Sequence, residues 1–137
     1  MSNDRHIELG KLGEDIAADF LKKNGYSIVA RNIRFSRYEL DIVAEDDNYL
    51  VFVEVKTRSC LYPESGVYGT PGSAVNSKKR TDTIKAANDY INKNHTSKQP
   101  RIDVIEIYMK ESSNGLYPQI LNINHIRNAF DSKGRKH

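Results

Sequence analysis

The chain has 137 residues, of which 38% are hydrophobic and 28% charged, a balance typical of a globular protein and not of a disordered one. This length is enough for one domain with a single core, and no apolar run approaches the roughly 20 residues that span a bilayer. The first residues lack the apolar stretch of a signal peptide, and the single cysteine, Cys60, excludes an intramolecular disulfide framework. We therefore expect a cytoplasmic protein that does not enter a membrane.

The net charge is +3, and the cations recur in short clusters. These clusters are Arg31, Arg34 and Arg37; Lys56 and Arg58; Lys78, Lys79 and Arg80; and Lys133, Arg135 and Lys136. Any one cluster is as readily explained by solvated surface as by a binding site. All of them together favour a polyanionic partner, such as nucleic acid.

The N-terminal region has the pattern of an amphipathic helix. Leucine, isoleucine and phenylalanine residues at helical spacing predict a helix over residues 6–24, with Gly25 at its C-terminal cap. Gly10 and Gly13 lie inside this helix, where each costs roughly 1 kcal/mol relative to alanine. That cost suggests close packing at these two positions, or a functional approach.

Three strand-like runs follow, over residues 26–31, 38–44 and 49–57. The polar residues 45–48 predict a hairpin turn between the second and third runs. Residues 59–73 are rich in Gly, Pro and Ser and predict a long loop.

The rest of the chain completes one domain. The remaining expected elements are a helix over 77–94, strands over 101–109 and 119–123, a turn over 112–115, and a brief helix over 125–130. The order helix, three strands, helix, strand predicts an α/β (α+β) fold. We expect a single domain over residues 1–130 and a disordered basic tail over residues 131–137.

The hairpin has a register that its turn would fix. If Asp47 and Asn48 form a two-residue turn, one face is entirely apolar and needs a covering helix; its pairs are Ala44 with Val51, Ile42 with Val53, and Leu40 with Val55. The opposite face pairs Val43 with Phe52, Asp41 with Glu54, and Glu39 with Lys56.

This register makes Asp41 and Glu54 cross-strand neighbours, roughly 5 Å apart at their Cβ atoms. Like charges at that distance repel unless a cation lies between them, and carboxylate oxygens suit Mg²⁺ or Mn²⁺. Lys56 would contact a phosphate or position a water molecule. The alternative is a solvated strand face with an ion pair between Glu39 and Lys56.

The motif Asp41…Glu54-Val55-Lys56 resembles the PD-(D/E)xK nuclease superfamily, whose fold is similar to that of type II restriction endonucleases. Further matches cover nearly the whole chain before the tail and include Gly10-x-x-Gly13-Glu14, Arg31-Asn32-x-Arg34, residues 39–44, residues 52–58, residues 101–104 and residues 126–130. The whole chain resembles one family of small, largely uncharacterised bacterial endonuclease-like proteins, and it is also similar to archaeal Holliday-junction resolvases. The resemblance implies a restriction endonuclease-like αβββαβ core, with a mixed sheet flanked by helices.

The resemblance also implies an activity and a set of site residues. The activity is divalent-metal-dependent hydrolysis of phosphodiester bonds in nucleic acid, with DNA favoured, in repair, recombination or DNA processing. Asp41, Glu54 and Lys56 would be catalytic, and Asp41 and Glu54 would bind Mg²⁺ (or Mn²⁺), with Glu14 as a third acidic ligand. An ordinary surface glutamate is the alternative at Glu14.

Two other functions remain open. The first is a catalytically silent nucleic-acid-binding module that retains the fold, and the second is a regulatory or assembly partner in DNA repair or uptake. The sequence also does not decide between a monomer and a homodimer.

Six basic residues are candidates for contacts with the nucleic-acid backbone: Arg31, Arg34, Arg58, Lys78, Lys79 and Arg80. The last three occupy the first turn of the second expected helix, where cations oppose the helix dipole. A choice against that local preference favours an anionic partner. Arg31 and Arg34 could equally brace the first strand.

Two further residues are singled out by the resemblance. Tyr38 stands where the resembling family usually has glycine, which suggests an altered backbone or a stacking role at the strand entrance. Asp103 lies in a matching stretch, but we expect its role to be structural.

Overall fold

The computed structural model describes residues 2–35, 38–59, 77–110 and 118–129. The elements in chain order are α1 (Ser2–Lys23), β1 (Ser27–Phe35), β2 (Tyr38–Glu45), β3 (Tyr49–Ser59), α2 (Ser77–Asn94), β4 (Gln99–Lys110) and β5 (Gln119–Ile126). These elements match the expected ones up to the second-last strand. The expected loop beyond Ser59, the turn over residues 112–115 and the basic tail over residues 131–137 lie outside the described residues.

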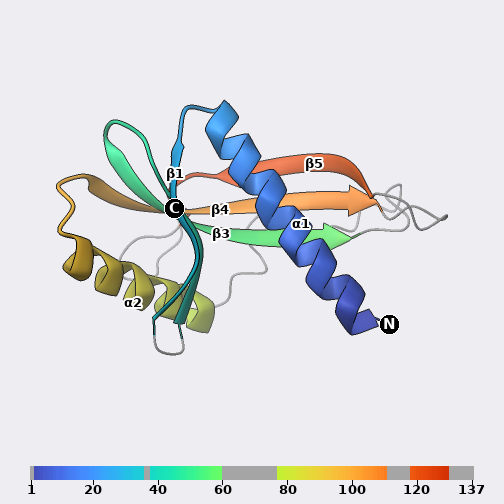
Figure 1. The fold of residues 1–137 in the computed structure, drawn as a ribbon, viewed down its shortest axis with the longest axis horizontal. Helices are drawn as coiled ribbons and strands as arrows, with labels where there is room; N and C mark the ends of the chain where they lie inside the picture. The colour runs from blue at the N-terminus through green and yellow to red at the C-terminus, as the bar shows by residue number, and fades with distance from the viewer. Residues whose placement is uncertain (1, 36–37, 60–76, 111–117, 130–137) are drawn as a thin grey trace.

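The strands form one mixed sheet in the order β1-β2-β3-β4-β5. β3 and β4 are parallel, and the other neighbouring strands are antiparallel. A parallel pair requires a crossover connection, which contains α2 here. α1 crosses in front of β3 and β4, and α2 lies beside the lower ends of β1 and β2 in the view shown (Figure 1). The expected α+β class and the mixed sheet are therefore confirmed.

Two hydrophobic cores lie on opposite faces of this sheet. Between α1 and the sheet, the buried residues include Ala17, Leu21, Ile42, Ala44, Val51, Val53, Ile105 and Ile107. Between α2 and the sheet, they include Leu40, Val43, Phe52, Ala86, Ala87 and Val104. The apolar hairpin face that needed a covering helix is thus covered by α1.

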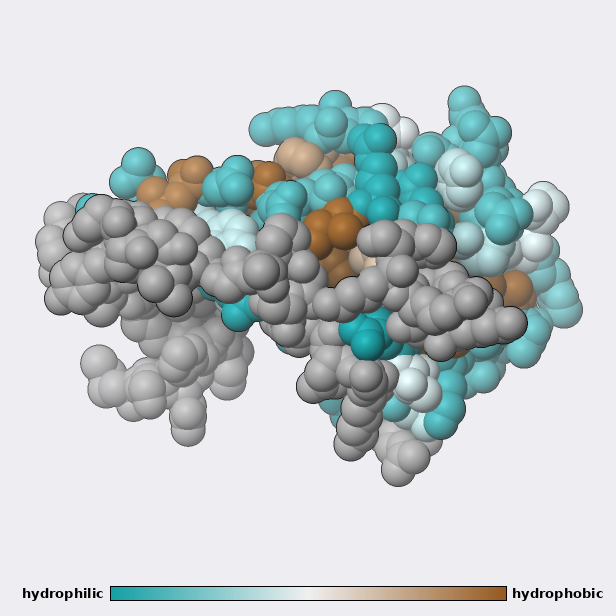
Figure 2. All heavy atoms as spheres, turned by 180° about the vertical axis from the view of Figure 1, so that it is seen from behind, coloured by the Kyte–Doolittle hydropathy of each residue, from teal (hydrophilic) through white to brown (hydrophobic). Residues whose placement is uncertain are grey.

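Few large hydrophobic side chains of the described residues remain exposed. Among these residues, Val29 and Ile120 are the large hydrophobic side chains that reach solvent, at 42% and 46% exposure. Hydrophilic side chains make up most of the described surface on the side shown in Figure 2, with smaller hydrophobic areas between them. Within the described part of the chain, no helix has the length and apolar character needed to cross a membrane.

The predicted hairpin register is confirmed over its central pairs. Ile42 pairs with Val53, Val43 with Phe52 and Ala44 with Val51. The Asp46 N–H donates to the Tyr49 carbonyl at 3.1 Å, which leaves the expected two residues at the tip of the turn. The Asp46 carboxylate accepts the N–H groups of Asn48 and Tyr49 at 2.9 and 2.7 Å, which closes that turn.

The prediction that Leu40 faces Val55 is wrong. Leu40 packs in the α2 core, whereas Val55 packs against the α1 core. In the neighbouring strand β1, Asn32 has a left-handed φ of 52°, so Ile33 packs on the α2 side opposite Leu40. The strict alternation of faces therefore breaks in the backbone beside Asp41.

The prediction of a brief helix over residues 125–130 is also wrong. β5 continues through Ile126, which pairs with Val104 of β4. Asn128 then adopts a left-handed φ of 51°, and the Ala129 N–H donates to the Ile102 carbonyl at 2.8 Å. Pairing with β4 satisfies backbone groups that a short terminal helix would leave open.

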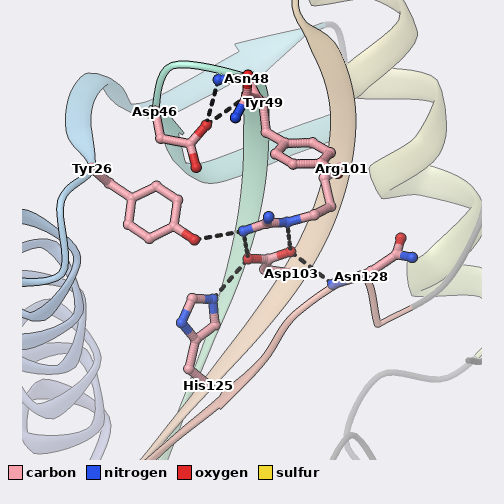
Figure 3. A network of polar contacts seen from close by, with 8 residues as sticks. All are labelled: Tyr26, Asp46, Asn48, Tyr49, Arg101, Asp103, His125 and Asn128. Carbon is pink, nitrogen blue, oxygen red and sulfur yellow. Dashed lines mark hydrogen bonds and ion pairs between the residues drawn. The ribbon is translucent and has the colours of Figure 1, made fainter.

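Asp103 has the structural role that the sequence suggested, at the centre of a polar network (Figure 3). Its fully buried carboxylate accepts two bonds from Arg101 at 2.9 Å, contacts His125 Nε2 at 2.7 Å, and accepts the Asn128 N–H at 2.9 Å. Arg101 also donates to the Tyr26 hydroxyl at 2.7 Å. This network joins β4 to the connection between α1 and β1 and to the end of β5.

The expectation of close packing at the two helix glycines holds for one of them. A Cβ added to Gly13 would collide with the Thr57 hydroxyl on β3, whereas a Cβ on Gly10 would meet no atom within 4 Å. Gly13 therefore lets α1 pack closely against β3, the strand that carries Glu54.

We predict opposite effects for alanine at these two glycines. Gly10→Ala should stabilise the protein by roughly 0.5–1 kcal/mol, because alanine favours the helix. Gly13→Ala should destabilise it by about 1–3 kcal/mol, because the overpacking outweighs the same helical gain. Urea unfolding of both variants measures the difference, and equal stabilisation by the two substitutions would contradict the close approach. Adding Thr57→Ala to Gly13→Ala should recover part of the loss.

Candidate active site

Asp41 and Glu54 lie side by side at the point where β2 and β3 stop pairing. The pairing between β2 and β3 ends at Ile42 and Val53. Beyond that point the Asp41 carboxylate accepts the Val55 N–H at 2.9 Å. The Asp41 and Glu54 carboxyl groups are close enough for the charge of Asp41 to raise the pKa of Glu54. The two carboxyl groups are thus neighbours, but the strand pairing does not extend to the predicted Asp41–Glu54 pair, because the Asp41 side chain takes the place of a backbone acceptor.

Burial makes these two acids expensive to ionise. Glu54 is only 4% exposed, and its burial raises its pKa to about 7, with a further upward contribution from the Asp41 charge. Burial also raises the pKa of Asp41, against the lowering effect of the Val55 N–H. The pair therefore resists joint ionisation near neutral pH.

Two lysines approach the same oxygen of Glu54. Lys79 Nζ lies 3.3 Å from Glu54 Oε1, and Lys56 Nζ lies 4.0 Å from it. Lys56 comes from β3 itself, two residues after Glu54, whereas Lys79 comes from the first turn of α2. The sequence pointed to Lys79 as a contact of the nucleic-acid backbone and did not indicate that it lies beside Glu54.

The expected alternative, an ion pair between Glu39 and Lys56, does not form. Among the described residues, Glu39 pairs with Arg34 at 3.8 Å, and Lys56 pairs with Glu54. Lys56 therefore lies in the carboxylate cluster, as the nuclease hypothesis requires.

Glu14 of α1 lies near this cluster but is not part of it. Burial raises the pKa of Glu14, and so does the Asp41 charge, while a hydrogen bond with Asn32 and the Arg31 charge lower it. Within the described ranges, no three Asp, Glu, His or Cys side chains come together as a metal-binding group. The assignment of Glu14 as a third ligand stays a prediction.

The basic residues expected to bind nucleic acid have different surroundings. Arg31 Nη2 lies 2.6 Å from Asp15 and 4.0 Å from Glu14, so it braces α1 against β1. Bracing of the first strand was one of the two roles that the sequence suggested for Arg31. Arg34 keeps 73% of its side chain exposed despite its contact with Glu39.

The remaining basic candidates lie along β3 and α2. Arg58 lies on β3 two residues beyond Lys56, and Arg80 follows Lys79 on α2. The side chain of Lys78 is outside the described residues. Contact with nucleic acid stays a prediction for all six residues.

Tyr38, at the start of β2, packs against the core beneath α2. It pairs with Phe35 of β1, belongs to the rim of the α2 core, and has Lys85 Nζ 5.6 Å from its ring centroid. The large side chain thus holds α2, and with it Lys79, beside the strand that carries Asp41.

The fold and the site define a small α+β protein in which one buried and one partly buried carboxyl group meet two lysines on a mixed sheet. Residues 13–107 match the model of "Uncharacterised protein family UPF0102". The chain belongs to this family.

Similar members of the family come from several bacteria. A UPF0102 protein of Chlorobium phaeobacteroides is 40% identical over 137 residues, which cover 97% of this chain and 100% of that protein. A UPF0102 protein of Clostridium botulinum is 41% identical over 125 residues, covering 90% and 94% of the two chains. A UPF0102 protein of Flavobacterium psychrophilum is 38% identical over 125 residues, covering 91% and 95%.

The raised pKa of Glu54 predicts how stability depends on pH in the absence of divalent cations. Because the folded-state pKa of about 7 lies above the ordinary value of 4.5, wild-type stability should fall as the pH rises from about 4.5 through 7. Glu54→Gln should remove this part of the fall in stability. Above pH 7 the free energy of unfolding of the variant should equal that of wild type or exceed it by up to roughly 1–3 kcal/mol.

Urea unfolding at pH 5 and pH 8 measures this effect. Glu45→Gln, which removes a half-exposed carboxylate paired with Lys98, is the matched control and should not reproduce the change. A Glu54→Gln variant that is several kcal/mol less stable than wild type at pH 8 would show that the carboxylate is structural.

Proposed function

We propose that this protein is a divalent-metal-dependent nuclease that hydrolyses phosphodiester bonds in DNA. The observation that carries the proposal is the buried Glu54 carboxyl group beside the partly buried Asp41, with Lys56 next to it. A strand as apolar as β3 does not need a glutamate for packing, and the raised pKa values mean that the ionised pair costs stability. Strongly perturbed carboxyl groups that face one another are typical of functional sites.

The residues present fit Mg²⁺ or Mn²⁺. Both metals prefer oxygen ligands, and Asp41 and Glu54 would supply carboxylate oxygens. A cation bound by both would offset the repulsion between their charges. When bound, the metal would polarise the scissile phosphate and lower the pKa of a bound water. Glu14 is close enough for its ionisation to depend on Asp41, which makes it the candidate for a third acidic ligand.

The chain's own residues prepare this site. The Val55 N–H fixes the Asp41 carboxylate, and burial restricts the Glu54 carboxylate to a dry position on β3. Lys56, about one-third exposed, can reach a phosphate oxygen and offset the charge that develops there. Exposed arginines such as Arg34 would hold the DNA backbone with little dependence on sequence.

The order of elements supports membership of the PD-(D/E)xK superfamily. The first six elements run αβββαβ, with Asp41 on β2 and Glu54-Val55-Lys56 on β3. We infer that the enzyme acts in the cytoplasm on DNA intermediates of repair, recombination or related processing.

A cleavage screen tests the proposal directly. Purified protein is incubated with duplex, single-stranded, flap and junction DNA, with Mg²⁺, Mn²⁺ or EDTA. We expect metal-dependent cleavage of at least one substrate, and a loss of at least about 100-fold in Asp41→Asn and in Lys56→Ala. Asp89→Asn, which changes an exposed residue of α2, should cleave as wild type does.

The variants also separate the rival functions. Lys56→Ala should keep metal binding while turnover drops, because the lysine acts on phosphate or water and not on the metal. Undiminished cleavage by Asp41→Asn would assign the activity to a contaminant. DNA binding without cleavage of any substrate would favour the catalytically silent module instead.

A further inference from the structure

The positively charged Lys79 side chain lies beside Glu54, one of the two proposed metal ligands. Its ammonium is 3.3 Å from Glu54 Oε1, closer than that of Lys56, and the charges of Asp41 and Glu39 also act on it. It lies in the first turn of α2, where the helix dipole disfavours a cation. The attraction of the carboxylates must therefore offset both that local cost and the partial burial of the ammonium.

A metal and the Lys79 ammonium would repel each other if both were at this oxygen. A divalent ion binds a carboxylate oxygen at about 2.1 Å. An ammonium 3.3 Å from the same oxygen would therefore lie within a few ångströms of the metal ion. The lysine side chain can leave, because four flexible methylene groups separate its ammonium from the helix and one-third of the side chain is exposed.

We propose that Lys79 is the internal counter-cation of the Asp41–Glu54 pair and competes with the divalent metal for Glu54. This inference rests on the metal site of the proposed nuclease. In the metal-free protein, Lys79 offsets part of the repulsion between the carboxylates and ties the start of α2 to β3. Metal binding displaces its ammonium towards solvent, where a phosphodiester of the substrate can take the place of Glu54.

Lys79 and Lys56 therefore have different relations to the metal. Lys56 is carried by the same strand as Glu54, with its ammonium 4.0 Å from Oε1, and it can stay beside the site when the metal binds. Lys79 is carried by a different element and must give up its closer contact. Removing Lys79 should thus strengthen metal binding, which is the opposite of what the loss of a structural residue would do.

Isothermal titration with Mn²⁺ alone measures this competition without any substrate. We expect Lys79→Met to bind Mn²⁺ about three- to tenfold more tightly than wild type, because one nearby positive charge is removed. Lys93→Met removes the same charge from the last turn of the same helix, roughly 20 Å away, and should bind as wild type does.

Thermal melts without metal supply a second readout. Lys79→Met should lower the melting temperature, and the loss should shrink when Glu54→Gln is also present, because the ion pair is then already gone. If Lys79→Met does not fold, Lys79→Arg keeps the charge and should bind Mn²⁺ no more tightly than wild type.

The outcomes separate this inference from the nuclease proposal. Equal or weaker Mn²⁺ binding by Lys79→Met, with normal binding by wild type, overturns the competition and leaves the nuclease standing. Tighter binding without cleavage of any DNA supports the competition and removes the nuclease. A wild type that binds no Mn²⁺ overturns both.

Discussion

The repulsion between two carboxyl groups, the buried Glu54 and the partly buried Asp41, is the constraint around which the middle of this sheet is arranged. β2 and β3 pair regularly up to Ile42 and Val53 and then part. Beyond that point the Asp41 side chain, not a backbone carbonyl, accepts the Val55 N–H. At this opening the charge of Asp41 acts on the carboxyl group of Glu54, which is only 4% exposed.

The neighbouring elements are adapted to this opening. Asn32 takes a left-handed conformation in β1 beside it, and Leu40 turns into the α2 core. On the other side of the sheet, Gly13 lets α1 approach Thr57, three residues beyond Glu54. The site is thus held by both helices, although its acids come from two strands.

A second buried acid shows what the fold does when a carboxylate is only structural. Burial alone would raise the pKa of Asp103, but hydrogen bonds from His125, Arg101 and Asn128 hold it below its usual range. The pKa of Glu54 moves the opposite way, to about 7, in spite of two nearby lysines. Hydrogen bonds thus stabilise the ionised form of Asp103, whereas burial and the Asp41 charge disfavour the ionised form of Glu54, which makes the Asp41–Glu54 pair the functional candidate.

Most of the fold could be predicted from the sequence because local patterns determine it. The helical stripe, the strand runs and the turn at Asp47-Asn48 gave the elements and the pairing of Ile42 with Val53. The path of Leu40 could not be predicted, because it depends on the backbone of Asn32 in another strand.

The last strand and part of the site depended on contacts between distant residues. The residues after Ile123 looked helical, but pairing with β4 and the bonds to Asp103 keep them extended. The contact of Lys79 with Glu54 joins residues that are separated by a crossover, and no local pattern encodes that distance. Asp41, Glu54 and Lys56 were predictable because one hairpin contains all three.

Anomalous scattering from crystals grown with Mn²⁺ tests most directly whether the carboxylate pair is a metal site. We expect a peak about 2.1 Å from an oxygen of Asp41 and from an oxygen of Glu54, with Lys79 Nζ moved away from Oε1. A crystal saturated with Mn²⁺ that shows no peak between these two carboxylates, and retains the contact between Lys79 and Glu54, would contradict it.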